Sequence, residues 1–223
     1  MNYQIDAPGS AIRTTVKLPA SKSISNRALI LNALSYSAYD VENLSDCDDT
    51  NLMVKALNSN DRDFNVGAAG TTMRFLTAFL SKVVGEWTIT GTERMKNRPI
   101  KVLVDALNAL GARIEYMEKE GYPPLRIFGS ALQGGEISLP GNVSSQYISA
   151  ILMIAPLTEN GVTLHLEGAI ISRPYIHITL QLMEQYGVRA SWTENTIKVL
   201  PQEYKPIRFT VESDWSAASY WYE

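Results

Sequence analysis

Three segments of the chain share one pattern, in which small or hydroxyl-bearing residues precede an almost wholly apolar run. They are ASKSISNRALILNAL from Ala20, AGTTMRFLTAFL from Ala69 and VSSQYISAILMIA from Val143. Apolar runs of this length behind a hydroxyl-bearing start are typical of a capped helix that packs into a core. We therefore predict three buried helices, each with a small, polar N-terminus.

A short stretch follows each of these helices before a second helix begins. The stretches are residues 39–44, 86–90 and 162–168. Val162, Leu164 and Leu166 share one face, which is the two-residue period of a half-buried strand. The second helices are predicted from Asp48, Arg98 and Ser172. Pro99 and Pro174 would lie in first helical turns, where proline is tolerated.

The last two units end in stretches that read as hairpins, with turns at residues 120–123 and 194–195. The spacings agree, because the two helix starts of a unit are 26, 28 and 28 residues apart. The first unit is shorter after Leu57. We predict an α+β fold with three copies of a helix–strand–helix–sheet unit around one core, rather than a solenoid, whose repeats are usually shorter.

Composition and charge reduce the number of protein classes to which the chain can belong. The 223 residues carry a formal net charge of -3, which disfavours a nucleic-acid-binding protein. The longest apolar run, residues 148–157, is about half of what a membrane span needs, and the N-terminus shows no signal peptide. The single cysteine, Cys47, excludes an internal disulfide and suits a reducing cytoplasm. We expect a cytoplasmic protein without a membrane segment.

The helix starts carry the candidate chemistry. The first N–H groups of a helix lack internal partners and lie at the positive end of its dipole, so they bind anions, phosphate above all. Serine hydroxyls, glycine and nearby cations such as Lys22 and Arg98 would strengthen such sites. The alternative for each start is a simple cap, and each arginine could be a structural ion pair.

Other polar residues point to no separate chemistry. Residues 45–50, SDCDDT, are read as a helix cap rather than a metal site. His165 and His177 have no partner at ligand spacing and are read as packing or surface residues. Cys47 is read as a small buried residue rather than a nucleophile.

Six segments occur in order along the chain: LPASKSISNRALILNAL, GAAGTTMRFLTAF, ERMKNRPIKVLVDAL, GNVSSQYISAILMIAPL, ISRPYIHITLQLMEQYGV and VESDWSAASYW. These segments resemble signatures of the 5-enolpyruvylshikimate-3-phosphate (EPSP) synthase family, also called 3-phosphoshikimate 1-carboxyvinyltransferases. The resemblance implies a fold of two domains, each a pseudo-threefold repeat of βαβαββ units in an inverse α/β barrel-like arrangement. Residues 15–208 would form one domain, and residues 1–14 and 209–223 would be pieces of the second.

The resemblance also implies an activity. The family transfers the enolpyruvyl group of phosphoenolpyruvate to the 5-hydroxyl of shikimate-3-phosphate and releases phosphate, in the chorismate pathway to aromatic amino acids. It uses no cofactor and no metal, and its partners are these two small molecules. A monomer is expected for the full-length protein.

The matching positions carry expected roles. Lys22 is expected to be catalytic and to contact both substrates, and Gln146 to lie between them. The expected shikimate-3-phosphate residues are Lys22, Ser23, Arg27, Ser144, Ser145, Gln146, Ser172 and Tyr175. The expected phosphoenolpyruvate residues are Lys22, Gly70, Arg98 and Gln146.

The sequence departs from the family pattern in three places. Ala68 stands where many members have asparagine, and Phe75 where proline is frequent. The stretch between Asp49 and Gly67 is shorter than in many members. The aromatic-rich end, from Trp215 to Tyr222, reads as a helix that would bury against the second domain, so we expect an N-terminal half that binds substrate but is inactive alone.

Two alternatives remain at this stage. One is a relative that transfers enolpyruvyl to UDP-N-acetylglucosamine; its loop cysteine has no counterpart here, because Cys47 lies elsewhere. The other is a non-catalytic module that binds phosphate-bearing ligands.

Overall fold

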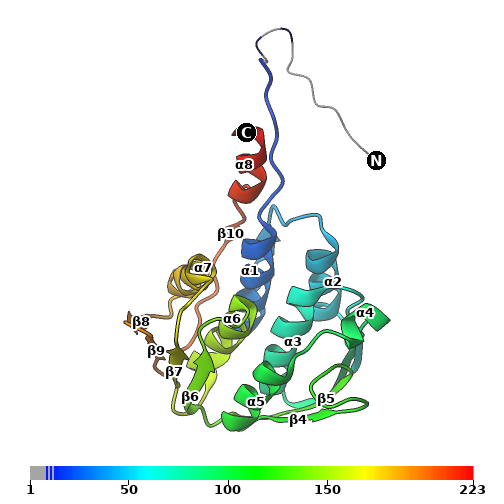
Figure 1. Cartoon of the computed structure of the whole chain (residues 1–223), viewed down its shortest axis with the longest axis vertical. Coiled ribbons are helices and arrows are strands. Elements are labelled where there is room, and N and C mark those ends of the chain that lie inside the picture. Colours follow the sequence, from blue (N-terminus) through cyan, green and yellow to red (C-terminus); the bar gives the residue numbers. More distant parts are fainter. Residues whose placement is uncertain (1–8, 10, 12, 223) are drawn as a thin grey trace.

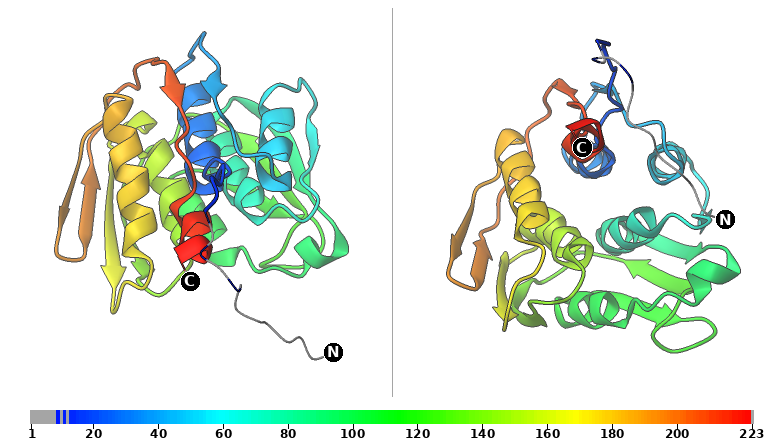
Figure 2. Two further views of the ribbon diagram at one scale, coloured as in Figure 1. Left: turned by 90° about the horizontal axis from the view of Figure 1, so that it is seen from above. Right: turned by 45° about the horizontal axis from the view of Figure 1, so that its top comes forward.

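Helices occupy the middle of the molecule and sheets flank them (Figure 1, Figure 2). The structure is a computed structural model that describes residues 9, 11 and 13–222. The helices are α1 (Lys22–Leu34), α2 (Asp48–Leu57), α3 (Gly70–Lys82), α4 (Glu93–Lys96), α5 (Lys101–Ala109), α6 (Ser145–Ile154), α7 (Arg173–Gln185) and α8 (Trp215–Tyr222). The strands are β1 (Val41–Glu42), β2 (Asp63–Asn65), β3 (Gly85–Thr90), β4 (Arg113–Tyr116), β5 (Leu125–Gly129), β6 (Gly135–Pro140), β7 (Val162–Glu167), β8 (Ala190–Thr193), β9 (Thr196–Val199) and β10 (Phe209–Thr210).

Two consecutive units of the chain have the same topology. One unit forms the sheet β2-β3-β5-β4, and the next forms β6-β7-β9-β8. In each, the first two strands are parallel and flank a helix, and the last two form an antiparallel hairpin. Both units are therefore βαβαββ, with the short α4 as an addition to the first of them. This confirms the predicted repeat and the α+β class, and the sheets of the described residues are open rather than closed into a barrel.

The first unit is shorter, as the sequence predicted. In the described residues its sheet consists of β1 and β10, which are parallel, and β10 comes from the far end of the chain. The hairpin that follows the second helix in the other two units has no counterpart after α2, since residues 58–62 lead directly to β2.

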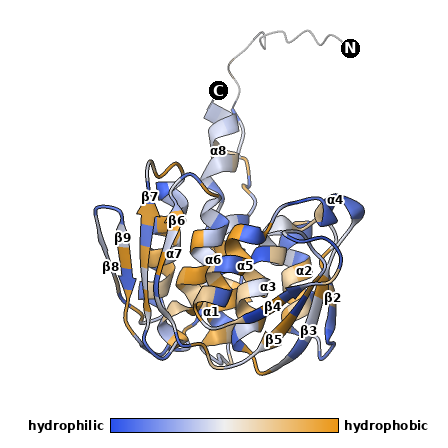
Figure 3. Ribbon diagram, turned by 60° about the horizontal axis from the view of Figure 1, so that its bottom comes forward, coloured by the Kyte–Doolittle hydropathy of each residue, from blue (hydrophilic) through white to orange (hydrophobic). Residues whose placement is uncertain are grey.

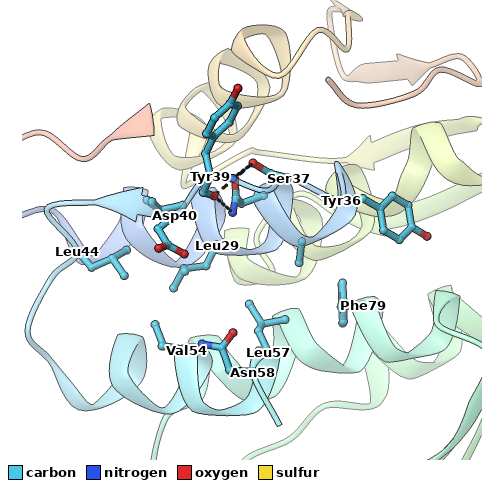
Figure 4. Close-up of a pocket in the computed structure, with 13 residues that line it drawn as sticks. Leu29, Tyr36, Ser37, Tyr39, Asp40, Leu44, Val54, Leu57, Asn58 and Phe79 are labelled. Atoms are coloured by element: carbon cyan, nitrogen blue, oxygen red, sulfur yellow. Dashed lines mark hydrogen bonds between the residues drawn. The ribbon is translucent and has the colours of Figure 1, made fainter. Parts of the chain in front are cut away.

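A cavity of about 540 Å³ lies between α1 and α2 of this unit. Leu29, Val54 and Leu57 form its apolar walls (Figure 4).

The two central helices α3 and α6 explain the apolar runs in the sequence. Every residue of α6 from Tyr147 to Ile154 is buried, and most of α3 is buried as well. A helix that is apolar on all sides must be surrounded by protein. Leu152 is fully buried, and its loss to alanine would cost about 2–5 kcal/mol of the free energy of unfolding. Figure 3 shows the apolar residues on the helices and strands of the body, beyond which α8 projects.

Three details differ from the sequence-based expectation. Pro99 lies before the helix rather than in its first turn, because α5 begins only at Lys101. The residue pattern alone does not predict β2 and β6, although the family resemblance implies a leading strand in each unit. β2 buries only Phe64 and is too short to show a period. β6 begins at the second of two glycines, which is typical of a loop, although Ile137 and Leu139 alternate inward. None of the described helices has the length and apolarity of a membrane span.

Candidate functional site

Asp49 joins the N-termini of three helices. It is the second residue of α2, and its carboxylate Oδ2 lies 3.2 Å from Nζ of Lys22, the first residue of α1. Its Oδ1 accepts hydrogen bonds from the backbone N–H groups of Thr71 (3.0 Å) and Thr72 (3.3 Å) in the first turn of α3. The carboxylate thus caps a helix other than its own, where the dipole favours negative charge.

The N-terminus of α6 lies at the same place. The Gln146 side-chain amide donates a hydrogen bond to the Thr71 hydroxyl over 3.2 Å. Ser144 is the N-cap of α6, and its hydroxyl accepts from the Gln146 backbone N–H. Four helix starts therefore meet at one end of the molecule, with an ammonium group, hydroxyls and an amide among them.

Arg98 extends this cluster at the start of α3. A Cβ added to Gly70 would collide with the Arg98 guanidinium and would lie 2.8 Å from Nη1 of Arg74. Burial lowers the pKa of Arg98, and the neighbouring charge of Arg74 lowers it further. Among the described residues, no carboxylate forms a salt bridge with either arginine. Two such cations side by side favour the binding of an anion between or beside them.

A backbone carbonyl of α3 and an aromatic ring of α6 fix the position of the Arg74 guanidinium. Its Nη1 donates to the Gly70 carbonyl at 2.7 Å, and its guanidinium carbon lies 5.3 Å from the centre of the Tyr147 ring. The Tyr147 hydroxyl in turn donates to the Pro99 carbonyl at 2.6 Å. Tyr147 on α6 thereby ties the Arg98 segment to Arg74 on α3.

Arg27 lies in the interior, beneath the helix starts, and is 2% exposed. Its Nε donates to the Thr179 hydroxyl at 2.7 Å, and its Nη2 to the Ser149 hydroxyl at 2.9 Å. Its Nη1 donates to the Ser23 carbonyl at 2.8 Å. Burial lowers the pKa of Arg27 to about 10.

The remaining predicted residues lie at helix starts as expected. Ser172 is the N-cap position of α7, but its side chain makes no capping hydrogen bond. Ser145 is buried in the first turn of α6, and Tyr175 is 43% exposed in the first turn of α7. Thr179 connects this helix to the others, because it bonds both Tyr175 and Arg27.

Several members of the cluster do not stand out in the sequence. The pattern indicates Asp49 only as part of a helix cap, and nothing in the sequence separates it from Asp48. Thr71 and Thr72 are indicated only as small helix-start residues, and Arg74 fits a structural ion pair equally well. A cavity of about 540 Å³ beside the cluster is lined by Asp49, Ala68 and Ala69, among others.

The comparisons with known proteins agree with one another. The family model for EPSP synthase (3-phosphoshikimate 1-carboxyvinyltransferase) matches residues 7–61 and 58–223. The chain belongs to the EPSP synthase family. A 3-phosphoshikimate 1-carboxyvinyltransferase of Bacteroides fragilis is 61% identical over 224 residues, which are 100% of this chain and 54% of that protein. One of Vibrio campbellii is 43% identical over 242 residues, covering 96% of this chain and 57% of that protein.

The fold agrees as well. The solved structure of EPSP synthase from Acinetobacter baumannii matches with a TM-score of 0.81 over 92% of this chain and 51% of that one. Its sequence identity is 21%, so this likeness supports the fold alone. The chain thus spans about half the length of the curated relatives that it matches.

Proposed function

We propose that the chain is the N-terminal part of a 3-phosphoshikimate 1-carboxyvinyltransferase, which moves the enolpyruvyl group of phosphoenolpyruvate to the 5-hydroxyl of shikimate-3-phosphate and releases phosphate. The observation that carries this proposal is the meeting of four helix starts around Lys22, Asp49, Thr71 and Gln146. Both substrates carry a phosphate and a carboxylate. Converging helix N-termini suit such ligands, as do guanidinium groups that form no salt bridge within the described residues.

The shikimate-3-phosphate site is proposed at the starts of α6 and α7. Ser144, Ser145 and Ser172 would bind the 3-phosphate with their hydroxyls and the adjacent backbone N–H groups. Ser23 and Arg27 would hold the ring hydroxyls and the carboxylate, and Tyr175 would flank the ring. The dipoles of α6 and α7 support this placement, since a dianionic phosphate at a helix N-terminus is stabilised.

The phosphoenolpyruvate site is proposed at the start of α3. The Gly70 backbone and the Arg98 guanidinium would hold its phosphate, and the absence of a side chain at Gly70 lets Arg98 lie against the helix start. Lys22 would contact both substrates, since it extends from α1 toward Asp49 and α3. Gln146, bonded to Thr71, would lie between the two ligands.

Within this scheme the described residues bind, orient and stabilise charge. As phosphate leaves, negative charge grows on the oxygens near Lys22 and Arg98, and fixed cations there lower the barrier. Arginine suits this position because its planar fork can bind two oxyanion oxygens at once. The groups that add and remove protons at the enolpyruvyl carbon would come from the rest of the enzyme, since this chain spans only 54% of the length of the Bacteroides fragilis relative.

The proposed domain division is 15–208, with 1–14 and 209–223 in a second domain. The position of α8 supports it, since α8 extends away from the body (Figure 1) and Trp215, Tyr220 and Tyr222 are 73%, 79% and 84% exposed. β10, the first two residues of the C-terminal piece, pairs with β1 and so lies on the body, and the chain leaves the body only after it. We further propose a cytoplasmic location, in keeping with the single free Cys47.

Calorimetric titration of the purified chain with shikimate-3-phosphate tests the proposal, followed by a phosphate-release assay with both substrates. We expect binding of shikimate-3-phosphate, weaker binding of unphosphorylated shikimate, and no turnover. Ser144→Ala should weaken binding of shikimate-3-phosphate but not of shikimate. Binding of UDP-N-acetylglucosamine in place of shikimate-3-phosphate would contradict the substrate, and turnover by the chain alone would contradict its dependence on the missing half.

A further inference from the structure

Arg27 is a buried cation whose charge has no counterion in the described part of the chain. Its side chain is among the least exposed of the polar residues, and no carboxylate forms a salt bridge with it there. Burying an unpaired charge is costly, and the lowered pKa of Arg27 reflects that cost. A cation kept in this state next to a set of helix N-termini points to an anionic ligand group rather than to stability.

Two hydroxyl groups hold one edge of the guanidinium. Ser149 on α6 and Thr179 on α7 lie 2.8 Å apart through their oxygens, and they accept from Nη2 and Nε of Arg27 respectively. The Thr179 hydroxyl donates to the Tyr175 carbonyl at 3.0 Å, so its lone pairs face the arginine and Ser149. The Ser149 hydroxyl therefore donates its proton to the Thr179 oxygen. Only this one orientation of each hydroxyl satisfies all of these hydrogen bonds.

A count of donors shows what remains for a ligand. A guanidinium carries five N–H groups, of which three are used by Thr179, Ser149 and the Ser23 carbonyl. One N–H on each terminal nitrogen remains without a partner among the described residues. Because the guanidinium is planar, N–H groups on its two terminal nitrogens can bind the two oxygens of one carboxylate.

We propose that Ser149 and Thr179 are positioning residues that fix Arg27 so that its two remaining N–H groups receive the carboxylate of the shikimate substrate. The proposal rests on the proposed function and adds to it a reason why the site prefers a ligand with a free carboxylate. The hydroxyl pair belongs to α6 and α7, the helices whose starts are proposed to bind the 3-phosphate. The same two helices would therefore set the distance between the phosphate and carboxylate ends of one ligand.

The test compares two ligands on one protein. Shikimate-3-phosphate and its carboxylate methyl ester are titrated into the chain and into Thr179→Val, which keeps the shape of the side chain but removes the hydroxyl. We expect the substitution to weaken binding of the acid by roughly tenfold, as is typical for loss of a hydrogen bond to a charged group. Binding of the ester should change by less than about twofold, because the neutral ester lacks the charge and the second strong acceptor oxygen of a carboxylate. Thr179→Ser should restore binding of the acid.

The control is Thr77→Val on α3. Thr77 is as deeply buried as Thr179, and its hydroxyl likewise donates to the carbonyl four residues earlier, that of Met73. It makes no contact with Arg27 among the hydrogen bonds of the structure. Thr77→Val should leave the ratio of the two affinities unchanged, whatever it does to stability.

The outcomes separate the two proposals. Equal weakening of acid and ester by Thr179→Val, or no discrimination between them by the unsubstituted chain, would overturn the positioning role while leaving the proposed function in place. Absence of shikimate-3-phosphate binding to the unsubstituted chain would overturn both. The Arg27 Nε–H signal in nuclear magnetic resonance gives a ligand-free measurement. It should exchange slowly in the chain and at least about tenfold faster in Thr179→Val, and equal exchange would also refute the positioning role.

Discussion

The carboxylate of Asp49 and the ammonium group of Lys22 form an ion pair of 3.2 Å between the first turns of two helices. The same carboxylate caps a third helix through Thr71 and Thr72. One side chain therefore sets both the position of the proposed catalytic lysine and the position of the helix start beside it. A change in Asp49 should act on stability and on binding together.

Asp49→Asn tests this relationship. The amide keeps one acceptor for the α3 N–H groups but removes the charge that attracts Lys22 and complements the helix dipole. We expect a loss of about 1–2 kcal/mol in the free energy of unfolding, measured by urea denaturation. Asp48→Asn is the control, because Asp48 is the adjacent residue in the same helical turn and is exposed. A loss of the same size in both variants would show that the contacts of Asp49 across the helices contribute nothing.

Gly70→Ala should separate folding from anion binding. The added methyl group must displace the guanidinium groups of Arg98 and Arg74, and the ends of these side chains can move. The helix itself tolerates alanine, so we expect the urea midpoint to change little. Phosphoenolpyruvate binding in the presence of shikimate-3-phosphate should fall by at least about tenfold, the scale of one charge-assisted hydrogen bond.

The control for this variant is Gly9→Ala, since a Cβ at Gly9 meets no atom within 4 Å. Unchanged phosphoenolpyruvate binding by Gly70→Ala would show that Arg98 does not need its place against the helix start. Loss of shikimate-3-phosphate binding to the same extent would show instead that the substitution disrupts the whole site.

Much of this architecture follows from the sequence, and the limits have physical causes. The starts of α3 and α6 can be predicted from the sequence, because a long apolar run that follows small polar residues is typical of a capped, buried helix. The contacts of Arg27 were not, because its hydroxyl partners lie 122 and 152 residues away and only the fold brings them together. Asp49 was missed for the same reason, since its capping partners belong to the next unit. Short strands such as β2 carry too few residues to show a period.

Tyr186 and Tyr204 offer a matched pair for the cost of a buried hydroxyl. Both side chains are buried, but the Tyr186 hydroxyl has no hydrogen-bond partner in the described structure, while the Tyr204 hydroxyl donates to the Met153 carbonyl at 2.8 Å. Tyr186→Phe should therefore stabilise the protein by about 1 kcal/mol, and Tyr204→Phe should destabilise it by about 1 kcal/mol. Thermal or urea unfolding of the two variants measures this, and shifts of the same sign would refute the assignment.

The same tyrosines predict a loss of stability in alkali. Burial raises the pKa of Tyr116 and of Tyr186 to about 12, and raises the pKa of Tyr204 as well. Because the unfolded phenols ionise near pH 10, the folded state holds more protons above that pH, so this contribution is complete below about pH 10 and lost between about pH 10 and 12. Arg27 and Arg98 act in the opposite sense, since burial lowers the pKa of each, but they are two groups against three. The urea midpoint should be flat to about pH 9 and then fall, and Tyr186→Phe should reduce the slope. A midpoint that rises above pH 10 would contradict this.

The aromatic side chains of α8 predict self-association of the isolated chain. Trp215, Tyr220 and Trp221 are 73%, 79% and 66% exposed on a helix that projects from the body. Exposed apolar groups gathered in this way favour contact with another protein surface. Size-exclusion chromatography and sedimentation over a range of concentrations should show an apparent mass that rises with concentration.

Replacing the three residues by glutamine should abolish the rise without changing the urea midpoint, because α8 contributes only Ala218 to the buried residues. Val84→Ser is the control, since Val84 is 83% exposed but lies outside α8. If the unsubstituted chain has a constant apparent mass, or if Val84→Ser alone removes the association, α8 is not the surface responsible.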